Sequence, residues 1–68
     1  MRLRQPPRFY DDEESIAHIC EIRGDYAGAI EMRWQIIALL KSDWNVTEGE
    51  GVDAHLREIE RLKRRMAQ

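Results

Sequence analysis

The side chains that could do chemistry in this chain are few, and their spacing is poor. Asp43, Asn45 and Thr47 match the first three ligand positions of a calcium-binding loop. However, Glu48 stands where such a loop needs glycine for its sharp turn, and Ala54 stands where the bidentate carboxylate belongs. The sequence therefore predicts no calcium site.

The remaining candidate ligands and nucleophiles do not form a site either. His18 and Cys20 are two residues apart on an expected helix, so they point to different faces and cannot share a zinc ion. Ser15 and Ser42 lack an adjacent base that would activate a nucleophile. Glycine-rich phosphate loops are absent from the sequence. We therefore predict that the protein is not an enzyme and needs no cofactor.

Length and composition limit the fold to one small domain. A chain of 68 residues buries a modest core, which supplies only about 3–5 kcal/mol of net stability. The single cysteine, Cys20, excludes an internal disulfide and suits a reducing compartment. No stretch approaches the roughly 20 apolar residues of a membrane span, and the first residues lack the apolar core of a signal peptide. We expect a cytoplasmic protein.

A helical hairpin is the clearest structural prediction. Apolar residues recur at helical spacing on both sides of Gly24-Asp25, over residues 12–23 and again over residues 26–42. Gly24 can adopt the left-handed conformation that ends a helix, and Asp25 can cap the next one. The apolar residues of the first helix are expected on its packed face: Ile16, Ala17, Ile19, Cys20 and Ile22.

Three small residues in the hairpin point to close packing. Ala17 and Ala29 would let the two helix backbones approach each other. Gly28 weakens the second helix by about 1 kcal/mol relative to alanine, and a close backbone approach at that point would explain it.

A loop at about 43–51 leads to a third helix that ends near Met66. Thr47 and Glu50 have capping-box spacing, which favours a helix start at residue 48, while the flanking glycines favour a start near Val52 equally well. No strand pattern occurs. The prediction is an all-α chain with an extended arm (1–10), a helix–turn–helix hairpin (11–44), and a loop with a C-terminal helix (45–68).

The hairpin resembles a tetratricopeptide repeat (TPR), a 34-residue helix–turn–helix motif with small residues at its packing points. Ile16-Ala17 stands where the family has Leu-Gly, Gly24-Asp25-Tyr26 matches the turn, and Ala29 matches the small residue of the second helix. The sequence departs from the motif at Glu13, Cys20, Arg33, Ile36 and Lys41.

The resemblance covers residues 11–44, and no second copy of the repeat is present in the sequence. In the family a lone repeat is unstable and arrays end in a solvating helix, which the third helix here resembles. The resemblance implies protein–protein interaction, through peptide binding or self-association, and no enzymatic activity. Whether the chain is complete or a piece of a longer array stays open.

Surplus apolar surface points to a partner. Trp34 either packs under the third helix or the arm, or it is an exposed anchor for a partner. The apolar stripe of the third helix, with His55 as a polar spacer, either packs on the hairpin or forms a seam between chains. We expect that a second copy covers this apolar surface in a homodimer. The alternative is that a larger protein or the missing repeats of an array cover it. The expected interaction residues are Trp34, Leu39, Trp44, Val52, Ile59, Leu62 and Met66.

A second function class is a small regulator that contacts nucleic acid through the basic C-terminal helix, by way of Arg57, Arg61, Lys63, Arg64 and Arg65. The formal net charge of −2 and the interleaved Glu58 and Glu60 argue against this, because they repel phosphates. We therefore rank protein interaction first.

Overall fold

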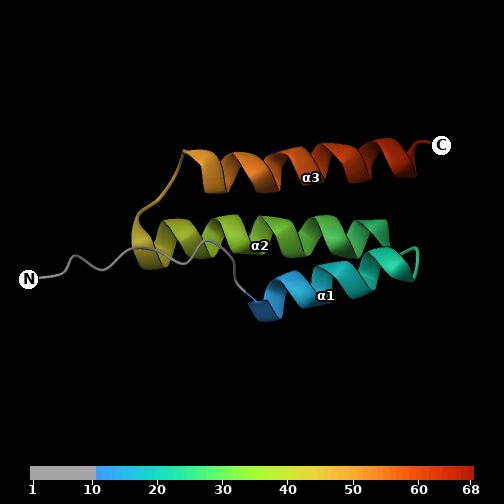
Figure 1. The fold of residues 1–68 in the computed structure, drawn as a ribbon, viewed down its shortest axis with the longest axis horizontal. Helices are drawn as coiled ribbons and strands as arrows, with labels where there is room; N and C mark the ends of the chain where they lie inside the picture. The colour runs from blue at the N-terminus through green and yellow to red at the C-terminus, as the bar shows by residue number, and fades with distance from the viewer. Residues whose placement is uncertain (1–10) are drawn as a thin grey trace, which may run out of the picture.

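The computed structural model describes residues 11–68. The predicted arm at residues 1–10 lies outside them. Residues 11–68 form three helices and no strand, so the all-α prediction is confirmed. In Figure 1, α2 lies between α1 and α3, and successive helices run in opposite directions. The helices are α1 (Asp11–Ile22), α2 (Tyr26–Trp44) and α3 (Glu50–Met66).

The turn between α1 and α2 has the predicted chemistry. Gly24 adopts a left-handed φ of 81°, which side chains other than glycine rarely tolerate. The Asp25 carboxylate accepts a hydrogen bond of 3.0 Å from the Gly28 N–H and so caps α2. Both predictions for this turn are confirmed.

Gly28 is small for a different reason from the one that we predicted. A Cβ atom at this position would collide with the carboxylate of Asp25, the side chain that caps the helix. The three atoms nearest to such a Cβ all belong to the Asp25 side chain. The glycine therefore makes room for the cap.

The helices pack through α2, which contacts both of the others. Ala17 and Ala29 are both buried, as expected for small residues where two helices cross. Between α2 and α3, the core consists of Ile36, Leu40 and Val52, and three half-buried residues pack against it: Ile37, Trp44 and Val46. The backbones of α1 and α3 do not approach each other closely. The molecule is therefore a row of three helices joined through the middle one.

The connection from α2 to α3 begins two residues later than predicted, because α2 continues to Trp44. Asn45 takes the left-handed conformation, with a φ of 56°, and its N–H donates to the carbonyls of the last turn of α2. Gly49 stands at the N-cap of α3 without a capping side chain. The predicted capping box of Thr47 and Glu50 is therefore wrong, and α3 begins between the two expected starts.

Candidate interaction surface

The apolar stripe of α3 belongs to the core of the chain. Val52, Ile59 and Leu62 are all buried, with at most 4% of each residue exposed. These side chains are packed inside one molecule, so they present no surface to a second copy. Their burial agrees with the first of the two expectations for this stripe, the packing of α3 on the hairpin.

The other expected interaction residues are divided between core and surface. Trp44 packs against the core at the end of α2, and Leu39 is half-buried. Trp34 is 45% exposed and Met66 is 52% exposed. Only the last two present large apolar surface to solvent, and they come from different helices.

A larger apolar surface lies on α1. Ile16, Ile19 and Ile22 are 47%, 48% and 71% exposed and follow one another at intervals of three residues. We expected these three residues on the packed face of α1, but Ala17 occupies that face. Spacing gave no signal of this, because α1 has apolar residues over most of its circumference.

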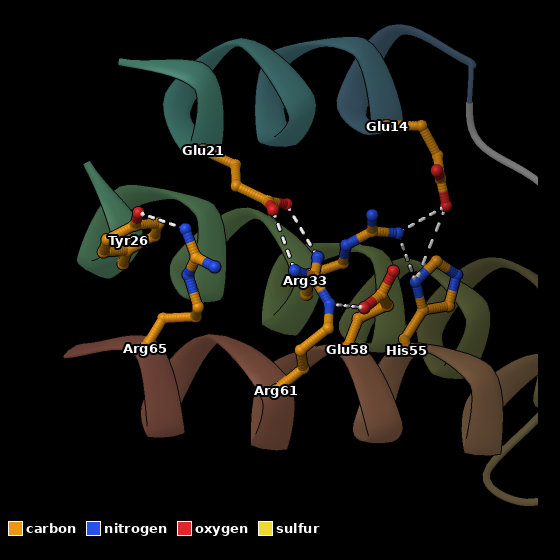
Figure 2. A network of polar contacts seen from close by, with 8 residues as sticks. All are labelled: Glu14, Glu21, Tyr26, Arg33, His55, Glu58, Arg61 and Arg65. Atoms are coloured by element: carbon orange, nitrogen blue, oxygen red, sulfur yellow. Dashed lines mark hydrogen bonds and ion pairs between the residues drawn. The ribbon is translucent and has the colours of Figure 1, made fainter. Parts of the chain in front are cut away.

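The opposite flank of α1 is polar and faces α3. Glu14 accepts a hydrogen bond of 2.7 Å from Nη1 of Arg33, and the same nitrogen lies 3.2 Å from Nδ1 of His55. Figure 2 shows these three side chains meeting from α1, α2 and α3. They form a partly buried cluster that ties all three helices together where α1 and α3 lack backbone contact.

His55 is the most buried polar residue of this cluster, at 3% exposed. Burial lowers its pKa below the ordinary value, and the adjacent positive charge of Arg33 lowers it further. The ring is therefore neutral at physiological pH, and its Nδ1 accepts from Arg33, because a guanidinium can only donate. Within the cluster, Nε of Arg33 is buried and has no hydrogen-bond partner among residues 11–68.

A second bridge joins α1 to α3. Arg61 donates two hydrogen bonds of 2.8 Å to the two carboxylate oxygens of Glu21, and its Nε donates to Glu58 at 2.6 Å. These bonds lower the pKa of Glu21 and raise that of Arg61. Farther along, Nη2 of Arg65 lies 3.3 Å from the hydroxyl of Tyr26, with its guanidinium over the ring (Figure 2). The charged groups on this flank thus satisfy one another.

Sequence reasoning missed Arg33 as the centre of the polar cluster. It was noted only as a departure from the repeat motif. Its position seven residues after Tyr26 puts it on the face of α2 that packs on other helices, where an arginine needs a carboxylate. That placement was a readable signal, although the partners, Glu14 and His55, could not be identified from spacing in one helix.

Other kinds of site find little support in the described part of the chain. Within residues 11–68, no group of three His, Cys, Asp or Glu side chains lies close enough to hold a metal ion. In the same residues, no helix is both long enough and apolar enough to cross a membrane.

Comparison with known proteins adds no relative: neither models of protein families, nor curated proteins, nor solved structures match this chain.

Proposed function

We propose that this chain is a non-enzymatic, cytoplasmic module for protein interaction or assembly, built as a TPR-like hairpin with a third helix. The observation that carries the proposal is the row of three exposed isoleucines on α1, Ile16, Ile19 and Ile22. Single exposed apolar residues are ordinary, but adjacent ones along a helix mark surfaces that another chain covers.

The packing of the hairpin supports this reading. α1 meets α2 through Ala17, a residue with little apolar surface, while its larger isoleucines remain outside. Helical hairpins of the repeat type cannot bury their apolar faces alone and are stabilised by stacking on a neighbour. A neighbour on α1 would remove from water the area that the hairpin itself leaves uncovered.

We propose a second copy of the chain as that neighbour. A core this small gains from oligomerisation, and closed two-fold assemblies are the commonest among soluble proteins. The remaining expected interaction residues, Trp34, Leu39 and Met66, are secondary contacts in this proposal. The polar flank between α1 and α3 is a poor docking surface, because its charges already pair with one another.

Sedimentation equilibrium of the full chain tests the proposal. Self-association should depend on concentration, and Ile19→Lys should weaken it by placing a charge in the apolar row. Ala54→Lys is the matched control, because it adds the same charge at an exposed position of α3, away from the row. A wild-type chain that remains monomeric at every concentration would overturn self-association, and equal effects of the two variants would show that the row is not the interface.

The alternative, contact with nucleic acid through α3, has less support. Arg61 is held by Glu21 and Glu58, and Arg65 is placed over Tyr26, so two of the basic residues are engaged within the chain. A basic surface for phosphates needs guanidinium groups that can leave their carboxylates.

A further inference from the structure

The exposed flank of α1 carries charges at both ends of its apolar centre. Asp12, Ile16, Ile19 and Arg23 are all exposed. They follow one another at intervals of four, three and four residues, which places them along one face of a helix. Arg23 keeps this register although α1 ends at Ile22, because its N–H still bonds to the carbonyl of Ile19 at 3.1 Å. The face therefore runs from an acid, through two isoleucines, to a base.

This order is complementary to itself in only one direction. The midpoint between Asp12 and Arg23 is also the midpoint between Ile16 and Ile19. When a second α1 is laid antiparallel on the first, each Asp12 faces the Arg23 of the other copy, and each Ile16 faces an Ile19. A parallel arrangement would instead place acid against acid and base against base, which repels.

We propose that two copies of this chain pair through α1 in an antiparallel arrangement about a two-fold axis, an inference that rests on the proposed self-association. Each copy contributes the same face, as a closed two-fold interface requires. The antiparallel order also sets the positive end of each helix dipole beside the negative end of the other.

Two other flanks of α1 are already occupied, and the exposed third one, around His18 and Ile22, carries no pair of opposite charges. Ala17 is buried against the rest of the hairpin, and Glu14 and Glu21 reach toward α3. A helix of 12 residues is about 18 Å long, so this contact is small compared with standard interfaces. We expect rapid exchange between monomer and dimer, with the dimer favoured at high concentration.

Charge reversal tests the pairing in the full chain. Asp12→Arg and Arg23→Asp each replace two attractive contacts of the dimer by two repulsive ones, so each should weaken dimerisation about tenfold in sedimentation equilibrium. The double variant should restore it, because its acid and base have only exchanged places. A mixture of the two single variants should associate more tightly than either alone. Glu31→Arg and Arg57→Asp, which reverse exposed charges on α2 and α3, are the matched controls and should leave dimerisation unchanged.

The outcomes separate this proposal from the function on which it rests. The antiparallel pairing is overturned if neither charge reversal changes dimerisation. It is also overturned if the double variant stays monomeric while circular dichroism shows a folded chain. Neither result overturns self-association itself. A wild-type chain that never associates overturns both. If reversal melts α1, the neutral variants Asp12→Asn and Arg23→Gln take its place, and they should weaken dimerisation and reduce its sensitivity to salt. Unchanged dimerisation in folded neutral variants overturns the pairing.

Discussion

Arg33 and His55 lie on different helices, and a single guanidinium nitrogen, Nη1 of Arg33, lies 3.2 Å from Nδ1 of His55 and 2.7 Å from the carboxylate of Glu14. One atom thus connects α1, α2 and α3. Because the backbones of α1 and α3 do not meet, this contact and the bridge between Arg61 and Glu21 hold the two outer helices together.

The buried His55 should make stability depend on pH. Its pKa is lowered in the folded chain by burial and by Arg33, although Glu14 and Glu58 oppose the shift. As pH falls below about 6.5, His55 takes up a proton in the unfolded chain before it does so in the folded chain. The free energy of unfolding therefore decreases as pH falls further. In urea unfolding, wild type should lose more stability than His55→Gln between pH about 7.5 and about 5.5. His18→Gln, which changes an exposed histidine, should behave like wild type; a wild-type response in His55→Gln would contradict the assignment.

The bridge between Arg61 and Glu21 should couple α1 to α3 in a salt-dependent way. Both side chains are partly exposed, so a double-mutant cycle of Arg61→Met and Glu21→Gln should give at most about 1 kcal/mol. Added salt should reduce this coupling. Lys63 and Glu60 provide the control pair, because their contact is 3.7 Å and more exposed, and its coupling should be near zero. Equal coupling in the two pairs would show that the bidentate bridge has no special role.

Gly28 and Asp25 should behave as one unit. Gly28→Ala gains helix propensity of about 1 kcal/mol but displaces the capping carboxylate, so its net effect on unfolding free energy should be small. Asp25→Ala alone should cost about 0.5–2 kcal/mol. In the Asp25→Ala background there is no cap left to displace, so Gly28→Ala should then be stabilising. Chemical denaturation measures all three, and additive effects would contradict the steric conflict.

Ala29 should not tolerate a larger side chain. It is 1% exposed, so Ala29→Leu should overpack the interior of the hairpin and cost roughly 1–3 kcal/mol. Ala27→Leu, at an exposed position two residues earlier on the other side of α2, is the control and should change little. A melting temperature of Ala29→Leu equal to that of wild type would remove Ala29 from the helix crossing.

Local features of this fold were predictable from the sequence because their causes are local. The turn at Gly24 and Asp25 follows from a glycine that tolerates positive φ and an acid that caps the next helix. Helical spacing of apolar residues predicted all three helices. The end of α2 and the start of α3 differ from the prediction, because the left-handed Asn45 ends α2 and Gly49, which has no capping side chain, precedes α3.

The surface was harder to predict because it depends on which face of each helix is used. α1 has apolar residues over most of its circumference, so spacing alone could not tell that Ala17 is inside and Ile19 outside. The cluster of Glu14, Arg33 and His55 unites residues from three helices, and no pattern within one helix encodes such a meeting.

The linear order of packing, α1 on α2 and α2 on α3, has a consequence for how the chain folds. Each helix makes its main apolar contacts with its neighbour in sequence, so only short loops must close before those contacts form. Such a topology has a low contact order and permits folding to begin at either hairpin. We expect the polar groups that join the outer helices to form after both hairpins, outside the folding nucleus.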